Sequence, residues 1–262
     1  MLINIGNGIL KGLIMELNEN ERIDDLEYKG LKIIQNKDGF CFGIDSVLLS
    51  DFAKEIKNNS KVVDLGTGTG IVSILLCGKT KLSEVIGIEV QKNVAHMAEK
   101  SSKLNNLQDR FKVININIKQ IDELRMNNSF DAVVTNPPYK KIDSGGKNEN
   151  KAKLISRHEI EGDLSDFIIT AQKLLKENGC LYMVHRPERL AEIIVKLRQR
   201  NLEPKKIRFI HSREDSQAKM VLIKAVKGGK EFTEIDKPLI IYKKDGSYSE
   251  EILKIYNKEV EK

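Results

Sequence analysis

From Lys61 onward, the sequence alternates short β-branched runs with longer stretches of helical periodicity. This order is typical of a parallel β-sheet with crossover helices, because parallel neighbours cannot be joined by a tight turn. The predicted strands are 62–64, 85–89, 112–116, 131–135, 180–185, 207–211 and 219–226. The predicted helices are 71–77, 92–105, 164–177, which closes at Asn178-Gly179, and 188–200. No helix separates the last two strands, so they should form a hairpin with one strand antiparallel to the rest.

Composition fits one soluble domain with additions. The chain has 262 residues, of which 40% are hydrophobic and 31% charged, and no apolar stretch approaches the ~20 residues of a membrane-spanning helix. Its three cysteines form no C-x-x-C pair and its four histidines lack metal-ligand spacing. We therefore expect no catalytic metal, no membrane partner and a reducing, cytoplasmic location.

The sequence divides into three parts. Residues 1–14 are predicted to be a non-structural extension, with translation starting at Met15. Residues 15–54 should pack on the domain and contain a strand at 31–35 and a helix that runs from an Asp45 N-cap to Phe52. Residues 55–262 form the main domain, including a final strand at 239–242 and helix at 250–256.

A glycine-rich turn, Asp-Leu-Gly-Thr-Gly-Thr-Gly at 64–70, follows the strand at 62–64 and leads into a helix. Glycines let the backbone approach a ligand that side chains would exclude. Glu89 closes the next strand, where its carboxylate can accept hydrogen bonds from both ribose hydroxyls. The Asp64 carboxylate would repel a pyrophosphate but attract an ammonium group. S-adenosylmethionine, which combines adenosine, a sulfonium and an amino acid, fits best. Its predicted ligands here are Asp64, Gly66, Gly68, Gly70 and Glu89.

The strand at 131–135 stops at Asn136-Pro137-Pro138-Tyr139. An adenine or amide nitrogen is a poor nucleophile because its lone pair is delocalised, so it must become tetrahedral before it attacks a methyl group. The Asn136 side-chain oxygen and the Pro137 carbonyl can hold its two hydrogens in that geometry and stabilise the positive charge that develops. Tyr139 would stack on the flat substrate. The predicted reaction is methylation of an exocyclic amino nitrogen, with Asn136, Pro137 and Tyr139 as catalytic residues.

These motifs resemble the class I N-methyltransferases, whose hallmark is (N/D)-P-P-(Y/F), and most of all the bacterial tRNA(Val) adenine N6-methyltransferases. The resemblance runs from Met15 to the C-terminus and also rests on residues 35–49 and 157–159. It implies a Rossmann-like fold, a doubly wound, seven-stranded, mostly parallel α/β sheet. It also implies that Asp64, Gly66 and Glu89 bind S-adenosylmethionine and that Asn136, Pro137 and Tyr139 hold an adenine beside the tRNA anticodon.

Asn117 departs from the family pattern. After the third strand such enzymes usually carry an Asp that accepts a hydrogen bond from the cofactor's adenine amino group. The amide oxygen of Asn117 can still accept that bond, without the charge. We therefore expect Asn117 to bind the cofactor more weakly than an Asp would.

The net charge of +6 is concentrated in two segments. Residues 140–157 contain six basic and two acidic side chains, and residues 186–213 contain nine and three. Both are expected at the rim formed by the carboxyl ends of the strands, where they would contact phosphates. RNA, and tRNA in particular, is the predicted partner. The predicted substrate-binding residues are Lys140, Arg157, His158 and Arg213. Since the chemistry needs no base, His158 should have a structural or substrate-positioning role rather than act as an acid or base.

Three alternatives stay open. A protein glutamine amide is the acceptor of the release-factor methyltransferases, which share N-P-P-Y but carry an N-terminal docking domain. DNA adenine would call for a larger recognition domain. A non-catalytic RNA-binding module would not need the cofactor residues. Adenine N6 in tRNA is favoured because only about fifty residues precede the domain and the basic segments suit nucleic acid.

Overall fold

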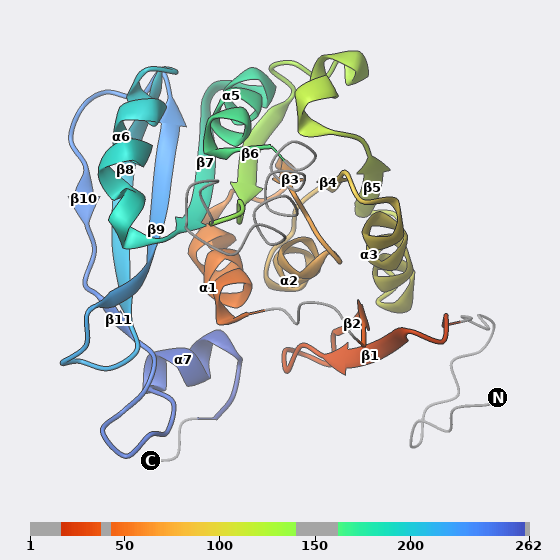
Figure 1. The fold of residues 1–262 in the computed structure, drawn as a ribbon, viewed down its shortest axis with the longest axis horizontal. Helices are drawn as coiled ribbons and strands as arrows, with labels where there is room; N and C mark the ends of the chain where they lie inside the picture. The colour runs from red at the N-terminus through yellow and green to blue at the C-terminus, as the bar shows by residue number, and fades with distance from the viewer. Residues whose placement is uncertain (1–16, 38–42, 140–161, 260–262) are drawn as a thin grey trace, which may run out of the picture.

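The computed structural model describes residues 17–37, 43–139 and 162–259. Its main sheet runs in the order β10-β8-β9-β7-β6-β3-β4-β5, and β11 also pairs with β8 (Figure 1). The seven long strands are β3 (Lys61–Leu65), β4 (Glu84–Glu89), β5 (Phe111–Asn115), β6 (Phe130–Thr135), β7 (Leu175–His185), β8 (Leu202–His211) and β9 (Ala218–Lys227). All seven predicted strands are present.

Strands β3 to β7 pair in parallel, and β9 runs antiparallel to both β7 and β8. The predicted doubly wound α/β sheet with a terminal hairpin is thus confirmed. Two short strands, β10 (Glu234–Ile235) and β11 (Leu239–Ile240), add to the outer edge of β8. The first was not predicted, because a two-residue exposed strand leaves no hydrophobic pattern. The described sheet therefore has nine strands rather than seven.

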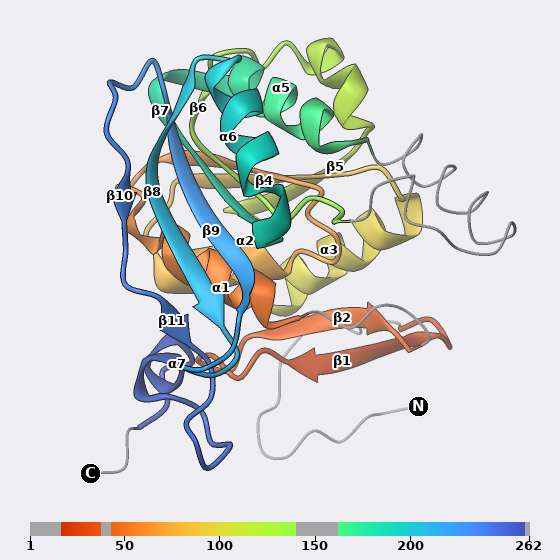
Figure 2. The same cartoon turned by 60° about the vertical axis from the view of Figure 1, so that its left-hand side comes forward.

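Helices cover both faces of the sheet (Figure 2). On one face lie α1 (Ile44–Phe52), α2 (Ile71–Lys79), α3 (Lys92–Leu104) and α7 (Glu250–Ile255); on the other lie α5 (Leu164–Leu174), α6 (Leu190–Arg198) and the 3₁₀ segment η2 (Ile118–Leu124). Consecutive residues of a strand point to opposite faces of the sheet. Val62 belongs to the hydrophobic core with α1 and α2, and Val63 belongs to the core with α5 and α6. Strands buried on both faces explain the uninterrupted apolar runs of the sequence.

Helix α5 ends three residues earlier than predicted. The backbone carbonyls of Lys173 and Leu174 accept hydrogen bonds from the backbone of Asn128 and Ser129, before β6, so they are not left to a helical cap. Leu175 is already extended and begins β7. Asn178-Gly179 is therefore not a helix C-cap but an irregularity within β7, where Asn178 has φ 62° and the pairing with β6 shifts register.

The N-terminal part contains an additional hairpin. β1 (Glu21–Asp25) pairs with β2 (Lys32–Asn36), although the polar run containing β1 was not predicted to be a strand. The hairpin lies against α3, because the amides of Lys32 and Ile34 donate to Asn105 Oδ1 and Ser101 Oγ, both at 2.9 Å. Helix α1 is present as predicted, but Gly43 is its N-cap and Asp45 lies in its first turn.

Residues 1–14 and the proposed start at Met15 lie outside the described residues, so that prediction and the three-part division stay predictions.

Near the C-terminus, the Ser249 hydroxyl caps α7 by accepting a hydrogen bond from the Ile252 amide. Among the described residues, no helix is long and apolar enough to cross a membrane.

Candidate active site

The glycine turn between β3 and α2 has an unusual backbone. Gly66, Gly68 and Gly70 all have positive φ, at 69°, 59° and 93°, a conformation that side chains disfavour. A Cβ on Gly70 would lie 2.8 Å from Phe111 Cε1, so this glycine permits close packing under the turn. A Cβ on Gly68 would meet no atom within 4 Å. Gly68 thus leaves open space beside the turn, as a ligand-binding backbone requires.

Asp64 anchors the turn from below. Its carboxylate is almost completely buried, and Oδ2 accepts hydrogen bonds from the hydroxyls of Thr67, at 2.7 Å, and Ser73, at 2.8 Å. Burial raises the pKa of Asp64 from 3.8 to about 6, against the effect of these two bonds. Asp64 does not line the cavity described below. The geometry gives it a supporting part in shaping the turn.

Glu89 ends β4 beside the turn. The residue is 6% exposed, its Oε2 accepts a hydrogen bond from the Gly68 amide at 3.1 Å, and its Oε1 accepts one from the Gln91 amide at 2.8 Å. These bonds hold the carboxylate at the edge of a cavity of about 240 Å³. Topology explains the contact, since β3 and β4 are parallel neighbours whose carboxyl ends meet.

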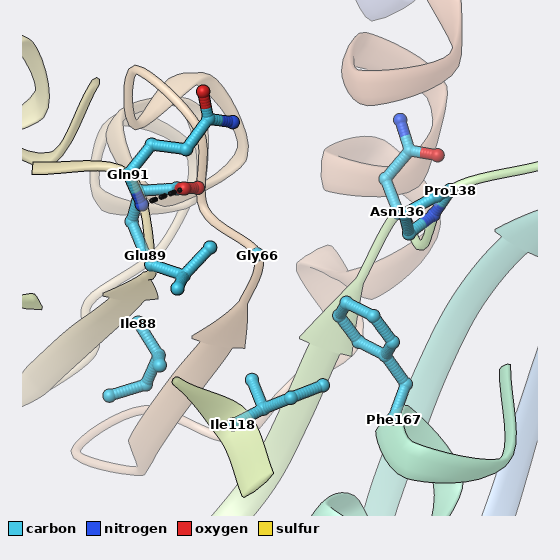
Figure 3. Close-up of a pocket in the computed structure, with 9 residues that line it drawn as sticks. Gly66, Ile88, Glu89, Gln91, Ile118, Asn136, Pro138 and Phe167 are labelled. Carbon is cyan, nitrogen blue, oxygen red and sulfur yellow. Dashed lines mark hydrogen bonds between the residues drawn. The ribbon is translucent and has the colours of Figure 1, made fainter. Parts of the chain in front are cut away.

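The same cavity extends to the end of β6. Figure 3 shows Glu89 and Gln91 on one side and Asn136, Pro138 and Phe167 on the other. Its lining residues are Gly66, Ile88, Glu89, Val90, Gln91, Ile118, Asn136, Pro138 and Phe167. The glycine turn, the Glu89 carboxylate and the Asn136 amide therefore share one opening. Pro137, predicted to be catalytic, is buried and does not line this cavity.

Asn136 is held by helix α1. Its Nδ2 donates to Asp45 Oδ2 at 3.0 Å and to Ser46 Oγ at 3.4 Å, and its Oδ1 accepts from the Tyr139 hydroxyl at 2.6 Å. The Tyr139 hydroxyl also lies 2.9 Å from Asp45 Oδ2. Asp45 was predicted as an N-cap and not as a site residue, although it lies in the segment 35–49 that carried the family resemblance.

Tyr139 packs against the end of β7. The His185 ring lies edge-on to it at 5.1 Å between centroids, and the exposed Arg186 guanidinium lies over it at 5.2 Å. Burial, followed by Asp45, raises the pKa of Tyr139, so its hydroxyl remains protonated. Burial, followed by the charge of Arg189, lowers the pKa of His185 to about 4, so His185 is neutral.

The remaining predicted cofactor residue, Asn117, caps η2. Its Oδ1 accepts from the Lys119 amide at 2.9 Å, whereas the next residue, Ile118, lines the cavity. Ile118 and Phe167 were not predicted as site residues, because a buried apolar side chain at the end of a strand or helix looks like core.

Of the four predicted substrate-binding residues, Arg213 lies among the described residues. Lys140, Arg157 and His158 lie outside the described residues. Arg213 is exposed in the β8–β9 turn, beside Glu214 and Asp215. That turn lies next to the β11 segment, since the Tyr242 amide donates to the Ser212 carbonyl at 2.9 Å.

The basic segment 186–213 does not all lie at the predicted rim. β8 has the same direction as β6 and β7, so residues 198–206 lie near its amino end, at the opposite edge of the sheet. Several of its cations are also paired, including Arg189 with Glu192, Arg198 with Glu203 and Arg208 with Glu251. The expectation that the whole segment flanks the pocket was wrong, and Arg186 is its member beside Tyr139.

The described residues contain no group of three or more His, Cys, Asp or Glu side chains arranged to hold a metal ion. The polar groups at the site instead suit an organic ligand. The buried Glu89 carboxylate lies at the cavity edge, and the open side of Gly68 admits close backbone contact. Both features fit the nucleoside and amino acid parts of S-adenosylmethionine.

A family model described as "Methyltransferase small domain" matches residues 43–203. The curated relatives include the tRNA1(Val) (adenine(37)-N6)-methyltransferase of Flavobacterium johnsoniae, 23% identical over 82% of this chain and 90% of that protein. The protein of the same name in Porphyromonas gingivalis is 29% identical over 65% of this chain and 68% of its own length.

Solved structures share the fold. A predicted O-methyltransferase from Agrobacterium tumefaciens superposes with a TM-score of 0.66 at 22% identity, covering 81% of this chain and 95% of that one. The TYW2 protein of M. jannaschii, solved in complex with AdoMet, superposes with a TM-score of 0.54 at 16% identity, over 82% and 89%. These neighbours confirm the predicted Rossmann-like architecture.

Proposed function

Since this chain belongs to the methyltransferase small domain family, with S-adenosylmethionine as its cofactor, we propose that it methylates the N6 amino group of an adenosine in tRNA. The observation that carries the proposal is that Glu89 and Asn136 line the same cavity. A nucleoside-binding carboxylate and an amide able to hold an amino group therefore face the same space. That arrangement suits transfer from a bound nucleoside cofactor to an amino nitrogen.

On the cofactor side, the Glu89 carboxylate would accept from the ribose hydroxyls, and the turn at Gly66 and Gly68 would contact the amino acid part. Asp64 would support this turn from below through Thr67 and Ser73. Asn117 and Gly70 complete the proposed cofactor residues. When bound, S-adenosylmethionine supplies an electrophilic methyl carbon, whose bond to sulfur breaks with its electron pair left on sulfur.

On the acceptor side, Asn136 Oδ1 and the Pro137 carbonyl would each accept one hydrogen of the adenine N6 amino group. This pulls the nitrogen toward tetrahedral geometry and frees its lone pair to form the new N–C bond. The two oxygens also stabilise the positive charge on nitrogen. One N–H proton then leaves to water, so no general base is needed. Tyr139 would stack against the adenine.

Two observations support an adenosine of tRNA as the acceptor. The tRNA1(Val) (adenine(37)-N6)-methyltransferases named above support an adenosine of tRNA. The exposed Arg186 above Tyr139 supports a phosphate-bearing acceptor, since its guanidinium is suited to bind phosphate. Lys140, Arg157, His158 and Arg213 are proposed to add contacts to RNA. A cytoplasmic location is proposed because the reducing cytoplasm suits a chain with free cysteines.

The test is transfer of labelled methyl from S-adenosylmethionine to total tRNA that lacks endogenous modification, followed by nucleoside digestion and mass spectrometry. We expect the label in N6-methyladenosine. DNA and a release factor, offered in parallel, should remain unlabelled. Label in either of these alone would keep the methyltransferase and overturn tRNA as its acceptor.

A matched pair of variants tests the proposed role of His158. His158→Ala should retain measurable turnover on tRNA, because a residue that only positions the substrate is not required for proton transfer. Asn136→Ala should abolish turnover. Equal loss in the two variants would contradict the assignment.

A further inference from the structure

We propose that Asp45, in the first turn of α1, is a positioning residue for methyl transfer. In this proposal Asp45 fixes the Asn136 amide and receives the Tyr139 hydroxyl hydrogen, which leaves Asn136 Oδ1 open to the substrate amino group. It rests on the proposed catalytic role of Asn136, and the test below separates failure of one from failure of the other.

Asp45 determines which end of the Asn136 amide faces the acceptor. A carboxylate accepts hydrogen bonds and donates none, so the amide nitrogen must point toward Asp45 Oδ2, 3.0 Å away. Ser46 Oγ, at 3.4 Å, lies on the same side. The amide oxygen then points away from α1. Without the charge on Asp45, the amide could rotate and present its NH₂ group, which cannot accept a hydrogen from an amino nucleophile.

In the structure, the Tyr139 hydroxyl lies within hydrogen-bond distance of Asn136 Oδ1. It lies 2.6 Å from Asn136 Oδ1 and 2.9 Å from Asp45 Oδ2, but it has a single hydrogen to donate. When this hydrogen points to Asn136, it takes up one of the two lone pairs of Oδ1. When it points to Asp45, both lone pairs of Asn136 Oδ1 can accept a hydrogen bond from the substrate. A charged acceptor makes the second bond the stronger type. Asp45 thus gives Tyr139 an alternative partner when the substrate binds.

The same contact tunes the electrostatics of the reaction. The chain from Asp45 through the Asn136 amide ends at the substrate nitrogen, and hydrogen-bonded groups in series polarise one another. A negative charge behind the amide makes Oδ1 a stronger acceptor as positive charge develops on the nitrogen. Asp45 would therefore act more strongly in the transition state than on the bound substrate.

The start of α1 is built to place this carboxylate. Gly43 is the N-cap, and a Cβ on it would lie 2.7 Å from Asp45 Oδ1. The φ of Gly43 is −96°, a value that any residue adopts, so its lack of a side chain serves space rather than conformation. Asp45 Oδ1 also accepts from the Ser46 amide at 2.9 Å. The Gly43→Ala substitution would thus displace the carboxylate without changing a charged group.

The experiment compares Asp45→Asn and Gly43→Ala with Asp51→Asn, a control later in the same helix. Asp51 pairs with Lys54 and Lys79, not with the site. Single-turnover and steady-state methyl transfer to undermodified tRNA, S-adenosylmethionine affinity and the melting temperature are measured for each. Asp45→Asn should lower kcat by about 10- to 100-fold, since a misplacement of ~1 Å can cost about 100-fold. KM for tRNA and cofactor affinity should change little.

Gly43→Ala should lower kcat in the same direction, and Asp51→Asn should leave it unchanged. In a Tyr139→Phe background, Asp45→Asn should cost less, because no hydroxyl then competes for Asn136 Oδ1. Unchanged kcat in Asp45→Asn and Gly43→Ala, with an inactive Asn136→Ala, would overturn this inference alone. An active Asn136→Ala would overturn the proposed function with it.

Discussion

The two halves of the site are built in different ways. In the cofactor half, the hydrogen bonds join neighbours in the sequence: Thr67 and Ser73 bind Asp64 across three and nine residues, and the Gly68 amide binds Glu89 across twenty-one. In the acceptor half, Asn136 and Tyr139 bind Asp45 across ninety-one and ninety-four residues. The cofactor half is formed within one βαβ unit, β3-α2-β4, whereas the acceptor half forms only when helix α1 docks on the sheet.

The contacts of the cofactor half can stay the same while α1 and the residues that follow β6 change. Substitutions in the acceptor half can therefore change the acceptor without changing cofactor binding. In this chain that half combines an amide, a phenol and a carboxylate within mutual hydrogen-bond reach.

The largest effect is expected for Asn136→Ala. Loss of the acceptor that holds the amino group should abolish measurable turnover, because removal of even one transition-state hydrogen bond costs about 100- to 1000-fold in kcat. S-adenosylmethionine affinity, measured by calorimetry, should stay near wild type because the cofactor half is untouched. A large loss of cofactor affinity would show that the two halves are energetically one unit and would break the comparison.

The second prediction uses two buried titrating groups, one beside each half. Burial raises the pKa of Asp64 to about 6, so its contribution to stability is full below pH 3.8 and is lost as pH rises through about 6. The rise corresponds to roughly 3 kcal/mol. Relative to wild type, Asp64→Asn should therefore gain up to ~3 kcal/mol in free energy of unfolding between pH 4 and pH 7, measured by urea denaturation.

His185 supplies the matched variant of opposite sign. Burial lowers its pKa to about 4, so its contribution is present above pH 6.5 and is lost as pH falls through about 4. The difference in free energy of unfolding between wild type and His185→Gln should therefore shrink as pH falls from 6.5 to 4. Parallel pH profiles for the two variants would contradict both assignments.

Much of the cofactor half was predictable because its signals are local. The β-branched runs marked the seven long strands, and the glycine turn and Glu89 stand one strand and one helix apart. What the sequence hid was set by tertiary contact. The end of α5 depends on carbonyl bonds to Asn128 and Ser129. Asp45 contacts Asn136, ninety-one positions further along the chain, only because α1 docks on the sheet. From the sequence, Asp45 was therefore predicted only as an N-cap.

A third prediction concerns Glu89→Gln, which removes a charge from the cofactor half. Hydrogen bonds to a charged group are worth about 1.5–3 kcal/mol, so S-adenosylmethionine affinity should fall by roughly 10- to 100-fold. At saturating cofactor, kcat should recover, because Glu89 does not contact the acceptor group. Calorimetry and steady-state kinetics check the two statements. A fall in kcat that saturating cofactor cannot restore would place Glu89 in the acceptor half as well.

The smallest expected effect separates two glycines of one turn. Both Gly68 and Gly70 have positive φ, so an alanine at either should cost a similar ~1–2 kcal/mol of backbone strain. Gly70→Ala would also press a Cβ against Phe111 and should lose about 1 kcal/mol more in thermal unfolding. Gly68→Ala points into open space, so it should instead weaken cofactor binding. If the order of the two stabilities were reversed, packing under the turn would not be the reason for Gly70, and the cofactor half would owe its shape to the backbone alone.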